Sequence, residues 1–231
     1  MKKGITAFRD SSLCDTVASV MKPSLIAFDM DSTLIACETL DRFAELRGVG
    51  SQIATITAQA MQGKIDFKAS LQKRCALLKG LSMVEVQKIL EAIPFTEGAE
   101  ELIQGLHKRS IHTALITGGP QVIAEPIARH LGISHVVSNQ FEFDSNGYFT
   151  GHVTPPLVDA SYKAHALNAL RTQLNIPQAE SVAVGDGAND IEMLKTAGIG
   201  VAFHAKPVLT SHADIVISEG SLLQLIPALG L

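Results

Sequence analysis

The sequence predicts an α/β protein whose core is a doubly wound, Rossmann-like parallel sheet. Two observations predict this class. Short apolar runs without polar alternation recur along the chain, which is typical of strands covered on both faces. Stretches with helical periodicity separate them, and this order builds a parallel sheet with right-handed crossovers. The apolar runs are residues 24–28, 112–116, 135–137, 181–184, 199–203 and 214–217, and the main helical stretches are 97–109, 121–131, 162–174 and 190–197.

The segment from residue 36 to residue 95 interrupts this order. It has no strand-like run but four helix-like stretches, and it starts just after the first strand, where open parallel sheets bind ligands. We therefore predict an inserted helical cap at 36–95, between core segments 1–35 and 96–231. The four helical stretches are 38–47, 52–61, 67–78 and 83–92.

A second interruption is the sequence FEFDSNGYFTG at residues 141–151. Apolar and polar residues alternate there around Asn146-Gly147, and this dipeptide is a strong signal for a tight hairpin turn. We expect a small β-hairpin beside the core.

The composition is that of a soluble globular protein with one catalytic unit: 231 residues, 46% hydrophobic and 18% charged. The net charge of -4, without any block of Lys and Arg, argues against nucleic acid and anionic membranes as partners. Cys14, Cys37 and Cys75 are odd in number and widely spaced, which argues against a disulfide framework and a zinc site. With no apolar run that suits a signal peptide or a membrane span, we expect a cytoplasmic protein, either a monomer or a homodimer.

Two acids follow the first predicted strand in the sequence FDMDSTL, namely Asp29 and Asp31. An aspartate carboxylate is ionised at neutral pH, so Asp29 needs no base to act as a nucleophile on phosphorus. Asp31 is suited to protonate a leaving alkoxide and later to deprotonate water. Taken alone, the same pattern is also typical of a turn rich in Asp and Ser.

A second acidic group ends another predicted strand, in the sequence VAVGDGAND. Because the carboxyl ends of parallel strands share one edge of the sheet, Asp186 should lie near Asp29 and Asp31. Such carboxylates suit Mg²⁺, which binds a few carboxylates together with a substrate phosphate. The alternative is a Gly-rich turn in which Asn189 or Asp190 caps a helix.

Two further groups are suited to a phosphate. The sequence LITGG offers the hydroxyl of Thr117 and the backbone N–H groups of Gly118 and Gly119 at the start of a helix. Lys163 supplies a point charge for a phosphoryl group, although a lone lysine is more often an exposed surface residue.

The four motifs occur along the chain in the order found in the haloacid dehalogenase superfamily, which the sequence resembles. DxDST at 29–33, ITGG at 116–119, Lys163 and GDGAND at 185–190 match its four motifs. The resemblance implies that Asp29 is the nucleophile, that Asp31 is the acid and base, and that Mg²⁺ is held by Asp29, Asp186 and the main-chain oxygen of Asp31. It also implies a set of phosphate and substrate ligands: Thr117, Gly118, Lys163 and Asn189, with Asp190 as a further candidate.

Within the superfamily, the predicted cap resembles that of the phosphoserine phosphatases, through ACETLD at 36–41, MQGKIDFKASLQKR at 61–74 and CALLKGLS at 75–82. This implies that Glu38 binds the ammonium group of O-phosphoserine and that Arg74 binds its carboxylate, an arrangement that suits both charges. Met61 and Phe67 match cap positions that face the substrate, although either could simply pack the cap. Thr117 stands where these enzymes usually have Ser; since the hydroxyl is kept, we expect activity to survive.

The expected function is Mg²⁺-dependent hydrolysis of O-phospho-L-serine through an aspartyl phosphate, the last step of serine biosynthesis. One alternative is transfer of the phosphoryl group to another small alcohol, or hydrolysis of another phosphomonoester. A second is a non-enzymatic phospho-acceptor like a response-regulator receiver, which needs neither Asp31 nor a cap. A dehalogenase is a weaker alternative, because that chemistry uses neither the second acid nor Mg²⁺.

Overall fold

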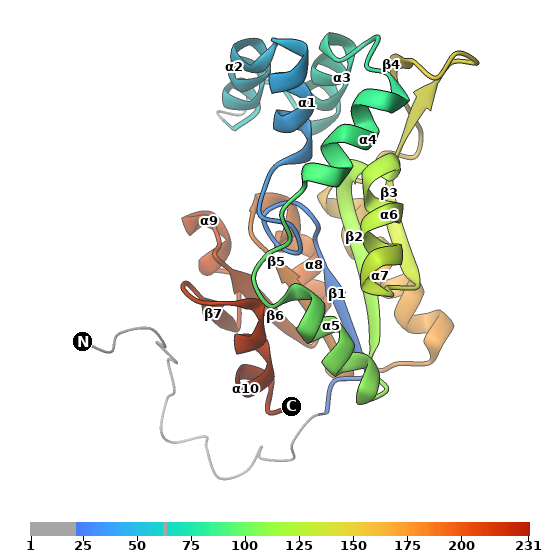
Figure 1. Cartoon of the computed structure of the whole chain (residues 1–231). Coiled ribbons are helices and arrows are strands. Elements are labelled where there is room, and N and C mark those ends of the chain that lie inside the picture. Colours follow the sequence, from blue (N-terminus) through green and yellow to red (C-terminus); the bar gives the residue numbers. More distant parts are fainter. Residues whose placement is uncertain (1–21, 62–63) are drawn as a thin grey trace.

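The computed structural model describes residues 22–61 and 64–231 and contains a seven-stranded sheet between two layers of helices (Figure 1). The strand order is β4-β3-β2-β1-β5-β6-β7, and every neighbouring pair is parallel except β3 and β4. The strands are β1 Leu25–Phe28, β2 His112–Pro120, β3 His135–Phe143, β4 Phe149–Thr154, β5 Ser181–Gly185, β6 Ile199–Phe203 and β7 Ile215–Ile217.

Strand β1 lies at the centre of the sheet, with β2 on one side and β5 on the other. The chain order of the strands therefore reverses at β1, and a crevice for ligands opens at the carboxyl ends of strands at such a point. All four residues of β1 are buried, as expected for a strand covered on both faces.

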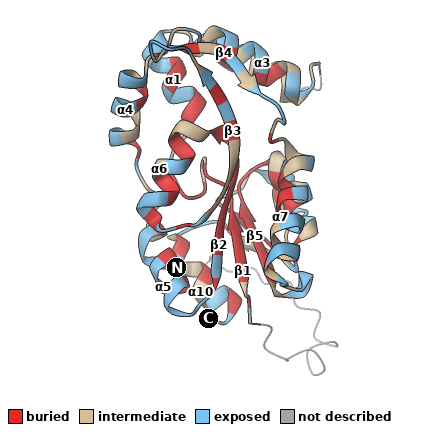
Figure 2. Ribbon diagram, turned by 90° about the vertical axis from the view of Figure 1, so that its right-hand side faces the viewer, coloured by how far each residue is buried: buried red, intermediate tan, exposed pale blue. Residues whose placement is uncertain are grey.

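Helices cover both faces of the sheet, which confirms the doubly wound prediction (Figure 2). Side chains of β1 alternate between the two faces: Ile26 and Phe28 join one buried cluster, while Leu25 and Ala27 join another. The first cluster contains residues of α5 Ala99–Lys108, α6 Gln121–Leu131 and α10 Leu225–Leu229, and the second those of α7 Ala160–Leu174, α8 Ile191–Thr196 and α9 Pro207–Thr210.

Four helices between β1 and α5 form a separate layer above one end of the sheet (Figure 1). They are α1 Thr39–Arg47, α2 Gly50–Met61, α3 Phe67–Leu77 and α4 Met83–Ala92, each within two residues of the predicted stretch. The chain enters and leaves this layer side by side, since the Ala36 N–H donates to the Pro94 oxygen at 2.9 Å and Ile35 pairs with Phe95. We call α1–α4 and their connections the four-helix segment.

The sequence of the four-helix segment contains local signals that start its helices. Asp66 accepts a hydrogen bond from the Ala69 N–H at the start of α3. Ser82 and Glu85 form a capping box at the start of α4, in which each side chain accepts a backbone N–H of the other. These bonds satisfy N–H groups that the first turn of a helix leaves without partners.

The hairpin forms where it was predicted, but it is larger and lies differently. Strand β3 joins the predicted run at 135–137 and the first hairpin arm into one strand, which pairs with β2 up to Asn139 and with β4 from Gln140 onward. The sheet is therefore mixed at this edge. The hairpin also contacts the four-helix segment rather than only the core, because Phe149 exchanges 2.8 Å backbone hydrogen bonds with Gly80 and Leu81. Within the described residues, no helix has both the length and the apolar character needed to cross a membrane.

Candidate active site

Three carboxylates meet at the carboxyl ends of β1 and β5. Asp29 directly follows β1, Asp186 directly follows β5, and Asp190 ends the short 3-10 turn Ala188–Asp190. One oxygen of each lies within 4.8 Å of the others, and all three residues are at most 5% exposed. The structure thus brings Asp29 and Asp186 together as the strand pattern predicts, but the third carboxylate comes from Asp190 and not from Asp31.

Lys163 is the cation of this cluster. It lies in the first turn of α7, which Asp159 caps by accepting the Tyr162 N–H at 2.8 Å. The ammonium group is buried and lies 2.8 Å from an oxygen of Asp29 and 2.8 Å from an oxygen of Asp190. Burial alone would lower the pKa of Lys163, but the charges of Asp190 and Asp29 outweigh burial and raise that pKa above its usual value. Lys163 therefore carries a fixed positive charge beside Asp29.

Both oxygens of the Asp29 carboxylate are held in place. Oδ1 accepts the Met30 N–H at 2.7 Å as well as the Lys163 ammonium, and Oδ2 accepts the Asn189 amide at 3.2 Å. A carboxylate fixed by three donors presents its remaining lone pairs in one direction, which suits a nucleophile.

Asp190 uses its oxygens to hold the loop after β5. Oδ2 accepts the N–H groups of Asp186 and Gly187, both at 3.2 Å, and Oδ1 pairs with Lys163. Burial raises the pKa of Asp190 and the charge of Asp29 adds to the rise, while Lys163 opposes it. With this many partners, Asp190 acts as a positioning residue for the loop and for Lys163.

Asp31 lies beside the cluster and has its own partners. Its carboxylate accepts the Thr39 N–H at 3.2 Å and the Thr39 hydroxyl at 3.0 Å, at the start of α1. Burial raises the pKa of Asp31 well above its ordinary value, and the charges of Glu38 and Asp29 raise it further against the two Thr39 hydrogen bonds. A carboxyl that holds its proton towards higher pH is suited to general acid catalysis.

The phosphate loop, residues 117–119, is the irregular carboxyl end of β2, and it packs directly on the segment that carries the acids. Thr117 is buried and its oxygen accepts the Gly119 N–H at 2.9 Å, which leaves the hydroxyl proton free to donate. A methyl group at Gly119 would come within 2.6 Å of Met30 Cε, so glycine lets the two segments approach this closely without a shift of the buried Met30 side chain.

Asn139, which the sequence reasoning missed, supports this phosphate loop. Its buried amide donates to the Gly118 oxygen at 2.8 Å and its carbonyl accepts the Val158 N–H at 2.8 Å. Asn139 comes two residues after the predicted strand run 135–137, but a polar residue at such a position carries no sequence signal for this bridge.

Glu38 and Lys206 lie at the rim, between the four-helix segment and the core. Glu38 is the N-cap residue of α1, accepts the Ser32 hydroxyl at 2.9 Å, and keeps 44% of its side-chain surface exposed. Partial burial is the main cause that raises the pKa of Glu38. Lys206 was not predicted; its ammonium lies 3.1 Å from Asp186 Oδ2 and 3.8 Å from Glu38 Oε1. Burial raises the pKa of Asp186, and Lys206 opposes that rise.

The remaining predicted residues come from the four-helix segment. Phe67 begins α3 and reaches the phosphate loop, since its Cζ lies 3.8 Å from where a Cβ on Gly118 would be. Arg74 is half-buried, and within residues 22–61 and 64–231 no carboxylate lies within 4.0 Å of its guanidinium. Burial lowers the pKa of Arg74. Met61 ends α2, and its side chain is outside the described part of the structure.

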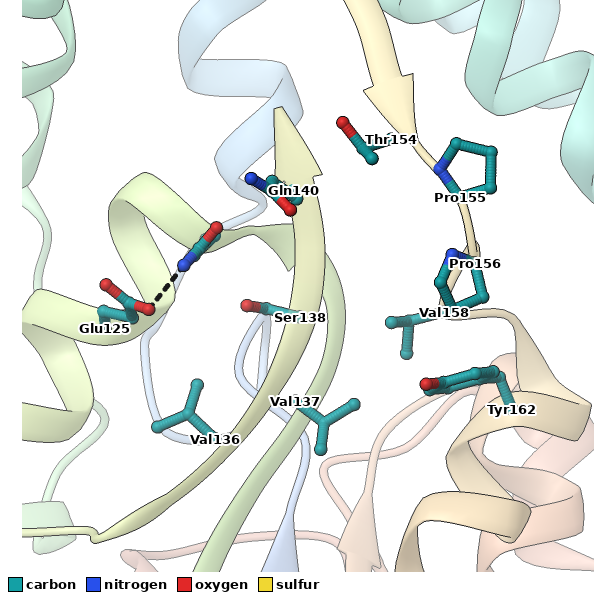
Figure 3. A pocket seen from close by; sticks show the side chains of 11 residues that line it. Glu125, Val136, Val137, Ser138, Gln140, Thr154, Pro155, Pro156, Val158 and Tyr162 are labelled. Carbon is teal, nitrogen blue, oxygen red and sulfur yellow. Dashed lines mark hydrogen bonds between the residues drawn. The ribbon is translucent and has the colours of Figure 1, made fainter. Parts of the chain in front are cut away.

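Two pockets lie outside the carboxylate cluster. One, of about 390 Å³, is lined by Phe67 and by residues of the loop after β4. The other, of about 320 Å³, lies along β3, with the side chains of Tyr162 and of two prolines on one wall (Figure 3). None of the predicted site residues lines this second pocket, whose wall residues are Gln121, Glu125, Val136, Val137, Ser138, Gln140, Thr154, Pro155, Pro156, Val158 and Tyr162.

The carboxylates fit a divalent metal, because hard cations prefer several carboxylate oxygens at one point. Asp29 and Asp186 have the geometry to share an ion, while Asp190 is committed to its own hydrogen bonds.

The family model of the haloacid dehalogenase-like hydrolases matches residues 26–195 of the sequence, which is more than half of the chain. The protein belongs to this family, whose phosphatases use a divalent metal.

Among curated relatives, the chain is 43% identical to the phosphoserine phosphatase of Idiomarina loihiensis over 89% of this chain and 93% of that protein. It is 42% identical to phosphoserine phosphatase SerB2 of Mycobacterium tuberculosis, but spans only 47% of that longer protein. A substrate-bound phosphoserine phosphatase structure superposes with a TM-score of 0.83 at 39% identity, covering 90% of this chain and 98% of that one. These similarities place the chain among the phosphoserine phosphatases of the hydrolase family.

Proposed function

We propose that the protein hydrolyses O-phospho-L-serine to L-serine and inorganic phosphate, the reaction that ends a route of serine biosynthesis. The observation that carries the proposal is the pair formed by Asp29 and Asp31. Asp29 is a buried carboxylate fixed by Lys163, Met30 and Asn189, while Asp31, two residues later, has a raised pKa and separate partners. One acid is thus suited to attack phosphorus and the other to carry a proton.

In the first step, an oxygen of Asp29 attacks the phosphorus, and the bond between phosphorus and the serine oxygen breaks. Asp31 gives its proton to that oxygen, so serine leaves as the neutral alcohol and Asp29 carries the phosphoryl group. Lys163, the Gly118 N–H and the Thr117 hydroxyl would balance the charge on the phosphoryl oxygens, while the Gly119 N–H holds the Thr117 oxygen.

In the second step, water attacks the phosphorus of the aspartyl phosphate. Asp31, now ionised, accepts a proton from that water, and the bond between phosphorus and Asp29 breaks. Inorganic phosphate leaves, Asp29 is again a carboxylate, and Asp31 is again protonated.

We propose that the divalent metal is Mg²⁺, held by Asp29, Asp186 and the main-chain oxygen of Asp31. Support comes from the all-oxygen donor set, which Mg²⁺ prefers. When bound, the ion would stabilise negative charge on the phosphoryl group.

We further propose that residues 36–95 act as a cap that recognises the serine part of the substrate. Support comes from Arg74, a half-buried cation with no carboxylate within 4.0 Å among the described residues, and from Glu38, a rim carboxylate beside the acid cluster. The guanidinium would bind the substrate carboxylate and Glu38 the ammonium group. Phe67 would close the site against the phosphate loop, with Met61 as a further candidate.

The cytoplasm would suit the free thiols of Cys37 and Cys75.

The test is phosphate release from O-phospho-L-serine, O-phosphothreonine, phosphoethanolamine and p-nitrophenyl phosphate, with Mg²⁺ and with EDTA. We expect a Mg²⁺-dependent preference for O-phospho-L-serine that Asp29→Asn abolishes, because the amide removes the nucleophile and changes little volume. Wild-type activity in Asp29→Asn would contradict the mechanism. A preference for another ester would contradict the substrate, and a phosphorylated alcohol in place of free phosphate would indicate transfer.

A further inference from the structure

Lys206 is a cation at the metal site that the proposed reaction leaves without a task. It lies in the loop after β6, where its backbone N–H donates to the main-chain oxygen of Asp186 at 2.8 Å. That bond fixes the start of the side chain beside Asp186. The ammonium group then reaches Asp186 Oδ2 at 3.1 Å and lies 3.8 Å from Glu38.

Asp186 has no other close cationic partner among the residues that the structure describes. Lys163 pairs with Asp29 and Asp190 instead. Asp186 is nevertheless nearly buried, with 6% of its side chain exposed, and it lies beside two other carboxylates. A buried carboxylate in such a group is costly unless a cation balances it. Lys206 supplies that balance from 3.1 Å.

The Lys206 side chain also has room to move away. It is 55% exposed, and its second acidic neighbour, Glu38, lies at the rim and not in the cluster. Lys163, in contrast, is fixed in the interior at 1% exposure. A divalent metal that takes Asp186 must compete with the ammonium group, because two cations beside one carboxylate repel each other.

We propose that Lys206 is the resident counter-ion of Asp186, and that its ammonium group competes with the divalent metal and so weakens metal binding. The proposal rests on the metal site of the proposed function but not on its substrate. Lys206 acts through Asp186 and is therefore a positioning residue, not a catalytic one.

The experiment measures the dissociation constant of Mg²⁺ alone by isothermal titration calorimetry, on metal-free protein at low ionic strength and without substrate. Lys206→Met removes the charge and keeps most of the side-chain length, whereas Lys206→Arg keeps the charge. Lys195→Met is the matched control, because Lys195 is an equally exposed lysine that pairs with a carboxylate, Glu192, on α8. Thermal unfolding in EDTA checks that each variant is folded.

We expect Lys206→Met to bind Mg²⁺ about tenfold more tightly than wild type, which corresponds to roughly 1.4 kcal/mol. Lys206→Arg and Lys195→Met should stay within about twofold of wild type. An unchanged or weaker affinity in Lys206→Met would overturn the proposal, as would an equal gain in Lys206→Arg. If the proposal is overturned in this way but wild type still releases phosphate from O-phospho-L-serine, only the role of Lys206 fails. If wild type binds no divalent metal at all, both the role of Lys206 and the proposed metal site fail.

Discussion

At the scale of single residues, Arg74 offers a sharp test of substrate recognition. Arg74→Ala should lower kcat/KM for O-phospho-L-serine at least about tenfold, since a hydrogen bond to a charged group contributes roughly 1.5–3 kcal/mol. The same change should leave kcat/KM for phosphoethanolamine, which has no carboxylate, within about twofold. The measurement is steady-state phosphate release with both esters.

Arg109→Ala serves as the control for Arg74→Ala, because Arg109 is exposed and its guanidinium donates to the Gly105 oxygen of α5, away from the site. Arg109→Ala should leave kcat/KM unchanged for both esters. Equal losses on both esters in Arg74→Ala would argue against recognition of the substrate carboxylate.

The residues that sequence reasoning placed well are those that directly follow a strand. Asp29 and Asp186 directly follow β1 and β5, which are neighbours in the sheet, so the order of strands alone brings them together. The partners of Asp31, by contrast, depend on the direction in which α1 leaves the sheet, and Asn139 and Lys206 act through contacts between distant loops. Periodicity describes elements one at a time and does not encode these contacts.

At the scale of elements, the capping box of α4 gives a prediction about pH. Ionised Glu85 accepts the Ser82 N–H and hydroxyl, both at 2.7 Å, and these hydrogen bonds lower the pKa of Glu85. A carboxyl whose pKa is lower in the folded state stabilises the fold above its unfolded pKa, and this stabilisation is lost as pH falls through the folded pKa. The free energy of unfolding should therefore fall more steeply on acidification in wild type than in Glu85→Gln.

Urea unfolding at about pH 6 and about pH 3.5 measures this difference. Breaking a cap of this kind costs roughly 1 kcal/mol, so Glu85→Gln should be less stable than wild type at the higher pH and close to it at the lower. Glu91→Gln is the control, because Glu91 lies at the other end of α4, where it accepts a hydrogen bond from the exposed Gln87 and takes no part in the capping box. If wild type and Glu85→Gln differed in free energy of unfolding by the same amount at both pH values, the role of the ionised carboxylate would be contradicted.

The elements themselves were largely predictable, since the strand runs and helical periods of this chain are clear. The exceptions are β2, which continues past the predicted end at residue 116 to Pro120, and β3, where Ser138, Asn139 and Gln140 suggested that the strand had ended. The strand continues through them because Asn139 is buried in its bridge and Gln140 already pairs with Thr154 of β4. Local polarity predicted an end that tertiary contacts override.

At the scale of the whole molecule, metal binding should stabilise the fold. Asp29, Asp186 and Asp190 repel one another at close range, and a cation bound by Asp29 and Asp186 relieves that repulsion. With Mg²⁺ at about a hundred times its dissociation constant, linkage predicts roughly 2.7 kcal/mol of added stability. The melting temperature should therefore rise with Mg²⁺ and fall with EDTA.

Asp186→Asn should lose most of this Mg²⁺-dependent shift, as measured by thermal unfolding with and without EDTA. Glu192→Gln, a change at an exposed residue of α8 a few positions further along the chain, should keep it. If Asp186→Asn shifts as much as wild type, the ion that stabilises the protein binds elsewhere.

The hairpin contact with the four-helix segment also limits how this protein can be recombined with others. Cutting at the two adjacent crossings near Ala36 and Pro94 would seem to release the segment as a module. However, the backbone of Phe149, in β4 and well after Pro94 in the sequence, pairs with Gly80 and Leu81 inside the four-helix segment. A chimaera that takes the helices from another enzyme must therefore take the end of the hairpin as well, or it will leave unpaired backbone groups at the seam.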